Sequence, residues 1–497
     1  MRLLTYNFLQ PGDPRSGAKG GGGVAIYQAN LVQALQAAGH DVVCMSSGDR
    51  YDPLPGSRPA RLAVRRDTVE RVEVVNSPVF APAHSIFHKI RRYTADTGLD
   101  AIPAALRARY GRFDALHFQN VEGLSAGFFR GLRRAYPDSA ILVSAHNYNL
   151  VCPQVNLWFR EHQVCTDYRG GRACTNCLVT PDRSRHELNI RRMDAILSRV
   201  GLPREGRAVG AAKWALRAPF RLARQLRSEP PGVAPLLIQD PDRARDYAAY
   251  RETNIALTDE VFDRVLAVSE RTRQVLAERG MPAERIALCP IGTTHHARFL
   301  KTRRITSAEG GLHLGYLGYM RADKGFYFLL AGLEALPDHW AAETSVTIAA
   351  PITDWQAVER LRAIAHRFRS IQVHDGYTHA SLDRVLAGVN LGVVPPLWED
   401  NLPQVALEMV SRGIPILASD RGGAQEIAGQ PDFTFRAGNW QDFILRLRAI
   451  ATGRIKLAQF WEKPLRLLSM QEHVAELEVF YSRAGRENAP RPCPPPR

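Results

Sequence analysis

The stretch Leu3-Leu-Thr-Tyr-Asn-Phe8 and the segment behind it decide the fold. The apolar run fits a short buried parallel strand, and the glycine-rich loop Gly17 to Gly23 follows it. Apolar residues then recur at helical spacing from Val24 to Leu35, and Gly39 provides a glycine stop for that helix. Asp41-Val-Val-Cys-Met45 begins the next strand. The pattern predicts one strand, loop, helix and strand unit of a doubly wound parallel sheet.

The same alternation of strands and helices runs along most of the chain. In the first half, further strands are expected at 114–118, 140–146, 264–269 and 285–290, with an interruption at 153–255. In the second half, strands are expected at 312–317, 346–349, 371–373, 391–394 and 414–418. Helices are expected between them near 324–335, 354–367, 380–388, 403–411 and 440–451. The chain therefore predicts two α/β sheets, each large enough for its own core.

These patterns divide the chain into parts. Residues 1–300 would form an N-terminal Rossmann-like domain, with an insertion at about 153–255. Residues 301–470 would form a C-terminal Rossmann-like domain. The segments that join them place a hinge near 297–310. A last helix at 471–486 is expected to pack back on the N-terminal domain, and the proline-rich tail 487–497 is expected to be disordered.

Two acidic residues frame the most informative motif, Asp400-Asn-Leu-Pro-Gln-Val-Ala-Leu-Glu408. It follows the expected strand 391–394, and Pro403 fits the first turn of a helix. Asp400 is then expected at the helix start, with Glu408 two turns further along the same face. Two carboxylates at the C-terminal edge of a parallel sheet can accept hydrogen bonds from sugar hydroxyls. The alternative interpretation is a favourable charge at a helix N-terminus followed by a solvated glutamate.

This motif resembles the paired-acid motif of the family-four (group 1) retaining glycosyltransferases, in the variant that begins with Asp. The resemblance extends to Gly413–Glu426, Gly318–Gly325, Ala267–Glu270 and Gly20–Gly23, which occur in the order found in the family. It implies a GT-B fold, in which two Rossmann-like doubly wound domains face a central cleft. In such a fold, 1–300 would be the acceptor-side domain and 301–470 would bind the nucleotide-sugar. The insertion would then be a cysteine-containing and basic helical segment of the N-terminal domain.

The resemblance assigns roles in the C-terminal half. It implies that Glu408 binds the ribose of the donor and that Asp400 contacts the donor sugar. Lys324 would bind the donor diphosphate, where its charge offsets the charge that develops on the leaving nucleotide. Asn401 and Leu402, inside the same motif, would complete the donor site. Catalysis would thus depend on Lys324, Asp400, Glu408 and a histidine of the N-terminal half.

That half contributes a second set of candidates. Gly22 and Gly23 open the first helix, where glycine allows close approach of the backbone and the helix N-terminus favours an anion. His146 ends an expected strand and resembles the family's histidine near the donor sugar and its β-phosphate. His117 ends another strand, and we expect it to line the acceptor side together with Asn120, although a structural role for His117 is an equal alternative.

The chain departs from the family pattern at three places. Tyr319 stands where the family usually has an arginine. Either Arg321 substitutes from a shifted loop, or the leaving group has one cation fewer. Pro290-Ile-Gly292 replaces the usual Pro-Asn-Gly, and the first acid of the motif is Asp400 rather than the commoner glutamate. These departures put donor identity and catalytic rate in question.

The resemblance also implies the reaction. Family-four enzymes retain the anomeric configuration and use no metal or other cofactor in catalysis. We therefore expect a hexosyltransferase that takes a UDP- or GDP-sugar as donor and a glycan or lipid-linked saccharide as acceptor, in cell-surface polysaccharide synthesis. The alternative is a catalytically silent GT-B scaffold that binds a partner or a nucleotide.

Four of the seven cysteines lie close together in the sequence, at Cys152, Cys165, Cys174 and Cys177. The last two have the spacing of half a zinc knuckle, and four thiolates can hold one structural Zn²⁺ in tetrahedral geometry. Reduced buried cysteines or a redox pair are equally compatible with the sequence. Some members of the resembled family carry a similar stretch.

The net charge of +15 points to an anionic partner. Residues 181–227 hold 12 Lys or Arg and 4 Asp or Glu, and the basic, apolar stretch 213–227 could lie on an anionic membrane surface. Few aromatic residues alternate with these arginines, so nucleic acid is not expected as a partner. The chain has no apolar run long enough for a signal-peptide core or a membrane span. We expect a cytoplasmic protein, with peripheral attachment to the inner face of the cell membrane as an option.

Overall fold

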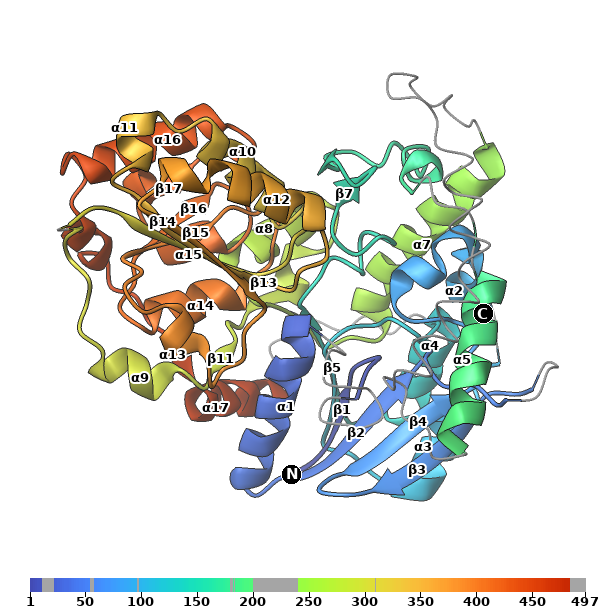
Figure 1. Ribbon diagram of the computed structural model, residues 1–497. Coiled ribbons are helices and arrows are strands. Elements are labelled where there is room, and N and C mark those ends of the chain that lie inside the picture. Colours follow the sequence, from blue (N-terminus) through green and yellow to red (C-terminus); the bar gives the residue numbers. More distant parts are fainter. Residues whose placement is uncertain are drawn as a thin grey trace.

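The protein contains two α/β units, one at each side of a shared interface (Figure 1). The computed structural model describes residues 1–10, 22–53, 58–95, 98–178, 182, 184–199, 240–308 and 310–482. Both units have a central sheet whose strands are buried, as expected for parallel strands covered by helices on their faces. The predicted α/β class with two Rossmann-like domains is confirmed. No helix among these residues is long and apolar enough to cross a membrane.

The N-terminal unit is built on an eight-stranded sheet of order β10-β9-β6-β5-β1-β2-β4-β3. Its strands are β1 Arg2–Tyr6, β2 Asp41–Ser47, β3 Arg61–Arg66, β4 Glu70–Val75, β5 Ala115–Phe118, β6 Ala140–Ala145, β9 Arg264–Ala267 and β10 Ile286–Leu288. Neighbouring strands run parallel, except that β3 is antiparallel to β4 at the sheet edge. The helices are α1 Gly22–Ala37, α2 Arg91–Thr94, α3 Ile102–Tyr110, α4 Ala126–Ala135, α5 Ser184–Arg199, α7 Pro241–Glu260 and α8 Glu270–Glu278.

The C-terminal unit has a six-stranded, fully parallel sheet of order β14-β13-β12-β15-β16-β17. Its strands are β12 His313–Leu317, β13 Ser345–Ala350, β14 Ser370–Asp375, β15 Leu391–Val394, β16 Ile416–Ser419 and β17 Thr434–Phe435. The helices are α10 Phe326–Glu334, α11 Asp338–Ala341, α12 Trp355–Ile364, α13 Leu382–Val385, α14 Gln404–Val410, α15 Ala424–Ala428 and α16 Trp440–Ala451. The predicted strands and helices of this unit lie within a few residues of the observed ones, whereas α11, α15 and β17 were not predicted.

Part of the expected insertion belongs to the N-terminal core. Helix α7 runs without a break through the predicted end of the insertion at 255, and its Tyr247 and Tyr250 are each 2% exposed. The Tyr250 hydroxyl donates to the Asn149 carbonyl at 2.5 Å, which joins the helix to the segment after β6. Among the described residues between β6 and α5 are the short strands β7 Trp158–Phe159 and β8 Gln163–Val164 and the 3₁₀ turn Cys174–Asn176. The interrupted part of the domain is therefore shorter than the sequence pattern indicated.

Two crossings join the units, and they pair with each other. Strand β11 Gly292–Thr293 lies parallel to β18 Leu468–Ser469, and α9 His296–Lys301 follows the first crossing. After the second crossing, α17 Met470–Tyr481 lies against α1 (Figure 1). The Tyr27 hydroxyl lies 2.6 Å from Nε2 of His473 in this contact. The last helix thus returns to the N-terminal unit.

A loop of the C-terminal unit is docked on the N-terminus of α8. Both carboxylate oxygens of Glu399 accept from Arg271, at 3.1 Å from Nε and 2.8 Å from Nη2. Ser269 Oγ donates to the Asn401 carbonyl at 2.6 Å, and Asn401 Nδ2 donates to the Ala145 carbonyl at 3.1 Å. The Glu399 side chain is 3% exposed and that of Arg271 is 23% exposed. The loop therefore carries a nearly buried ion pair between the two units.

Replacing Arg271 with methionine should lower the free energy of unfolding by about 3 to 5 kcal/mol, because Glu399 would keep a buried charge without its main partner. Urea denaturation followed by circular dichroism measures the change.

Arg273→Met is the matched control on the same helix. Arg273 pairs with Glu270, and their side chains are 44% and 36% exposed. Its loss should cost much less than the loss of Arg271, because both partners of this pair are largely exposed to water. Equal effects of the two substitutions would show that the Arg271 pair contributes no more than a surface pair.

Candidate functional site

Lys324 and Asp400 form a direct ion pair beneath Trp398. Lys324 Nζ lies 2.6 Å from Asp400 Oδ2 and 4.8 Å from the centre of the Trp398 ring. Trp398 also meets Tyr148 of the N-terminal unit edge to face, with ring centres 6.5 Å apart. The pair therefore lies where the two units meet. The structure brings together these two predicted site residues, which are 76 positions apart in the sequence.

Asp400 reaches this position from a loop and not from a helix. Helix α14 begins at Gln404, so the expected place of Asp400 at the helix start is wrong. Pro403 precedes the helix in an extended conformation, which places the first acid in the interdomain loop. Gly422 has φ of 65°, and a Cβ there would collide with the Asp400 backbone, so the glycine permits this close approach. Leu402, next in the motif, is partly buried against the C-terminal core.

The second acid, Glu408, is on α14 and is 5% exposed. Its Oε2 accepts from the Tyr377 hydroxyl at 2.7 Å, and its Oε1 lies 3.5 Å from Nε2 of His379. The His295 ring contacts the His379 ring, with centres 5.0 Å apart. Glu408 also lines a cavity between the units, together with residues from α1, from the first crossing and from the segment after β14. The lining residues are Ile26, Tyr27, Asn30, Ile291, Gly292, Thr293, Thr294, His295, His379, Gln404, Leu407 and Glu408.

Glu408 sets the protonation of its neighbours. Its hydrogen bond raises the pKa of His379 above the usual value, although burial acts in the opposite direction. Burial lowers the pKa of His295 to about 4, so this ring is neutral at pH 7. Burial and the charge of Glu408 both raise the pKa of Tyr377, which keeps its hydroxyl a donor. The Glu408 side chain thus contacts the Tyr377 hydroxyl and the His379 ring at the same time.

His146 faces this region from the end of β6. Its Nε2 lies 2.9 Å from Gln119 Oε1, and its ring centre is 4.8 Å from that of Tyr27. Burial lowers the pKa of His146 to about 3, with a smaller contribution from His473. The imidazole is therefore neutral at pH 7 and acts through hydrogen bonds, not as a cation.

His117 and Asn120 lie deeper in the N-terminal unit. His117 is 2% exposed, and its ring nitrogens lie 2.8 Å from the Tyr481 hydroxyl and 2.8 Å from Ser144 Oγ. Asn120 donates to Asn7 at 2.6 Å and is 5% exposed. Both side chains take part in a buried polar network that joins the sheet to α17. In this arrangement neither ring nitrogen of His117 is directed to an open surface.

The start of α1 meets the donor half. The Gly23 carbonyl accepts from Gln404 Nε2 at 2.7 Å, which joins the predicted glycine loop to the paired-acid motif. Gly22 has φ of 56°, a conformation that favours glycine. The rest of the run, Gly20 and Gly21, lies outside the described residues.

Arg321 is bound to its own loop. Its Nε and Nη2 lie 2.9 and 2.7 Å from the two carboxylate oxygens of Asp323, while its side chain is 57% exposed. Burial lowers the pKa of His84 in the N-terminal unit, and the nearby Arg321 guanidinium lowers it further. Tyr319, which replaces the family's arginine, is 46% exposed. The cation therefore lies at the interface of the units, in an ion pair with Asp323.

Sequence reasoning did not single out Glu399, Tyr377, His379, His295 or Trp398. Glu399 and Trp398 directly precede the paired-acid motif, and Tyr377 and His379 directly follow β14. Since ligands bind at the carboxyl ends of parallel strands, polar residues just after each predicted strand would have identified part of this set.

The four clustered cysteines are reduced in the structure. Cys152, Cys165, Cys174 and Cys177 are free thiols, and the pKa of each is raised, mainly by burial. For Cys174 the next largest effects come from Cys152, Cys177 and Cys165, so the four side chains occupy one neighbourhood. Within the described residues, the groups of three potential ligand atoms that lie within 4.8 Å of one another do not include this cluster. The stretch 213–227 and the tail 487–497 lie outside the described residues.

Two facing Rossmann-like units with polar groups at their interface define the chain as an α/β protein of the GT-B class. Its fold is similar to that of sucrose-phosphate synthase (tll1590) from Thermosynechococcus elongatus, with TM-score 0.52, 16% identity and 98% of each chain covered. It is similar to the lipopolysaccharide outer core galactosyltransferase WaaB in its apo form, with TM-score 0.51, 12% identity, and 97% of this chain and 99% of that chain covered. Anabaena Alr3699/HepE in complex with UDP is also similar, with TM-score 0.50, 10% identity, and 98% and 97% covered.

Residues 311–452 match the family model described as Glycosyl transferases group 1. The predicted resemblance to this family is confirmed for these residues, which belong to the C-terminal unit. No curated protein matches the chain in sequence.

Replacing Glu408 with glutamine should return the pKa of His379 toward the ordinary value of about 6.5, because the carboxylate is the main cause of its elevation. NMR titration of histidine-labelled protein reads this pKa directly. Since the folded-state pKa is above the unfolded value, the stabilisation from this pair is complete below pH about 6.5 and is lost as pH rises through the elevated value.

Glu359→Gln serves as the control, since this exposed acid pairs with Arg362 and not with His379. An unchanged His379 pKa in Glu408→Gln would contradict the assignment.

Proposed function

We propose that the chain is a retaining hexosyltransferase that moves a sugar from a UDP- or GDP-sugar to a glycan or lipid-linked saccharide. The observation that carries the proposal is the Lys324–Asp400 pair, which lies at the meeting of the two units with Trp398 over it. A cation and an acid so placed match the needs of a diphosphate and of sugar hydroxyls. The UDP bound by the similar Anabaena protein supports UDP as the nucleotide.

The ribose and the diphosphate of the donor would bind to different side chains of the protein. Glu408 accepts the ribose hydroxyls in place of the hydroxyl of Tyr377, while Lys324 and Arg321 meet the diphosphate. Gly22 and Gly23 approach the phosphate from α1, and Asn401 with Leu402 shapes the loop under the sugar. In this proposal, Asp400 exchanges part of its contact with Lys324 for a hydroxyl of the donor sugar.

The protein would act mainly by positioning and by electrostatic stabilisation. As the bond between the anomeric carbon and the phosphate oxygen breaks, negative charge grows on the nucleotide and Lys324 offsets it. The released phosphate oxygen accepts the acceptor's proton on the same face, so the configuration is retained without a protein nucleophile or a metal. Neutral His146 would hydrogen-bond near the sugar. His117 and Asn120 would position the acceptor side through Ser144 and Asn7.

The remaining assignments are part of the same proposal. The product would belong to cell-surface polysaccharide, and stretch 213–227 would hold the enzyme at the inner membrane face. Cys152, Cys165, Cys174 and Cys177 would bind one structural Zn²⁺ after their side chains rotate together. The competing function is a silent scaffold, which the paired state of both Lys324 and Arg321 favours, because neither cation is free for a diphosphate.

Nucleotide binding separates the transferase from a scaffold that binds only a partner, and turnover separates it from a silent scaffold that binds a nucleotide. Calorimetry with UDP and GDP should show binding to the wild type, and Glu408→Gln should weaken it about 10- to 100-fold, because hydrogen bonds to a charged group contribute about 1.5 to 3 kcal/mol. Glu359→Gln is the matched control. No binding of either nucleotide to the wild type would favour the scaffold.

Turnover tests the catalytic role of Lys324. With a panel of UDP- and GDP-sugars and nucleotide release read by mass spectrometry, Lys324→Ala should reduce kcat about 100- to 1,000-fold, as for loss of one group that stabilises transition-state charge. Lys301→Ala removes an exposed lysine of α9 and should leave kcat unchanged. A wild-type kcat in Lys324→Ala would refute the proposed role.

A further inference from the structure

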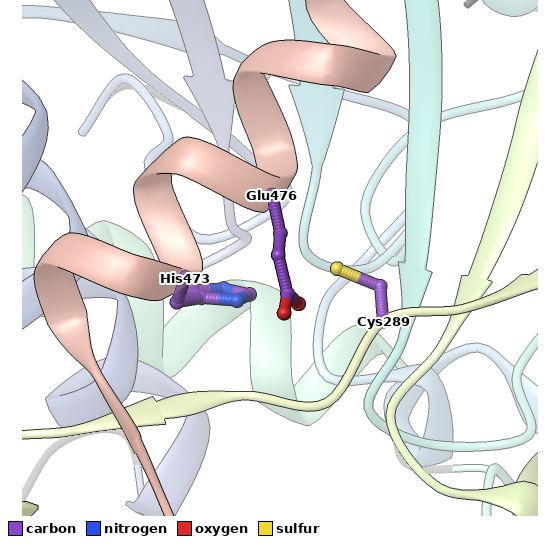
Figure 2. Close-up of side chains that lie close together, drawn as sticks. All are labelled: Cys289, His473 and Glu476. Carbon is purple, nitrogen blue, oxygen red and sulfur yellow. The ribbon is translucent and has the colours of Figure 1, made fainter.

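A second polar cluster lies at the crossing between the units, where Tyr27 contacts both His473 of this cluster and His146. Cys289 follows β10, while His473 and Glu476 are three residues apart on α17. One potential ligand atom from each, the sulfur, a ring nitrogen and a carboxylate oxygen, lies within 4.8 Å of the other two. Figure 2 shows the three side chains converging, with the Glu476 carboxylate between the imidazole and the sulfur.

The spacing on α17 suits a metal site. Residues three apart in a helix lie on the same face, so His473 and Glu476 present their side chains together. Helical pairs of Glu and His at this spacing supply metal ligands in bundle proteins. Cys289 completes the set from the opposite segment, which gives one sulfur, one nitrogen and one oxygen.

One ring nitrogen of His473 is buried without a well-aligned hydrogen bond, although the Pro290 carbonyl lies near the ring. The residue is 1% exposed, and its Nε2 lies 2.6 Å from the Tyr27 hydroxyl. Its Nδ1 is buried with no hydrogen bond among the described residues. Burial lowers the pKa of His473 to about 4, against a smaller opposing effect of the Pro290 carbonyl. The ring is therefore neutral, and when Nε2–H donates to Tyr27, Nδ1 carries the lone pair that a cation needs.

Cys289 and Glu476 would supply negative charge to a bound cation, and the cation could reach the site from solvent past Glu476. Cys289 is 3% exposed, and burial raises the pKa of its thiol to about 12. Glu476 has a side chain that is 35% exposed and lies 3.6 Å from Arg466. A cation can therefore enter from the Glu476 side. On binding, it takes the sulfur as a thiolate and releases one proton to solvent, so affinity rises with pH.

We propose that Cys289, His473 and Glu476 form a structural site for a divalent transition metal of the Zn²⁺ type, with water as the fourth ligand. Mixed sulfur, nitrogen and oxygen ligands select this class over Mg²⁺ and Ca²⁺, which prefer oxygen alone. The Tyr27 hydroxyl orients the histidine from behind. The metal joins α17 to the first crossing and so reinforces the β11–β18 pairing next to it.

Co²⁺ binding to the full-length chain tests this site. The chain is stripped with a chelator and titrated with Co²⁺, whose absorption bands report thiolate ligands. The titration is made in a Cys174→Ser/Cys177→Ser background, which removes the other cysteine cluster as a source of signal. One equivalent of Co²⁺ should bind with a thiolate band, and a further Cys289→Ser substitution should remove that band.

Three milder variants sharpen the test in the otherwise unaltered chain. Glu476→Gln should lose one equivalent of Co²⁺, and Tyr27→Phe should weaken binding about 10- to 100-fold, as expected for a partner that orients a ligand. Glu478→Gln is the control on the same helix, since this carboxylate pairs with His40, and it should bind like the wild type. Circular dichroism confirms that each variant is folded.

Two results would overturn the site. One is a folded Cys174→Ser/Cys177→Ser chain that binds no Co²⁺, and the other is a thiolate band that survives Cys289→Ser. Neither outcome bears on nucleotide binding, so the donor-site proposal is tested separately.

Discussion

The buried ion pair between Arg271 and Glu399 is the contact on which the interdomain site depends. It fixes the loop that carries Trp398 and Asp400. The adjacent Asn401 side chain donates to the Ala145 carbonyl and so holds the same loop against the end of β6. A charge that is nearly excluded from water needs its partner, so this loop has one favourable position. The side chain of Asp400 is thereby presented to Lys324. The geometry of the Lys324–Asp400 pair therefore depends on the separate ion pair between Arg271 and Glu399.

A second constraint is the protonation state of the histidines that line the interface. Burial keeps His146 and His295 neutral, while Glu408 favours the charged form of His379. The region thus has a few fixed charges and several neutral hydrogen-bonding rings. Such an arrangement leaves the net charge of the site to Lys324 and the acids, whose positions the loops determine. A ligand that brings its own negative charge therefore gains no charge attraction from the neutral rings of His146 and His295.

The sequence predicted most of the fold because parallel strands and amphipathic helices leave local patterns. It also predicted Lys324, Asp400 and Glu408, since each belongs to a short motif. It did not predict that Arg271 meets Glu399, because the two lie 128 positions apart and only the docking of two finished units joins them. Strand β3, with the sequence Arg-Leu-Ala-Val-Arg-Arg, was missed because an edge strand with charged ends lacks a continuous apolar run. The sequence also did not predict that α7 continues past residue 255. Its many polar residues obscure the pattern of its buried tyrosines.

The parallel pairing of β11 with β18 places both interdomain connections side by side. Any rotation of one unit against the other then has a single axis close to this two-stranded ribbon. Displacement grows with distance from an axis, so His295 and Glu408, which share a cavity with β11, change their separation least. In such a rotation, the part of the cleft that is far from the axis changes its width most, and the cavity beside β11 changes its width least. The part of a ligand that binds in this cavity would then keep similar contacts before and after the rotation.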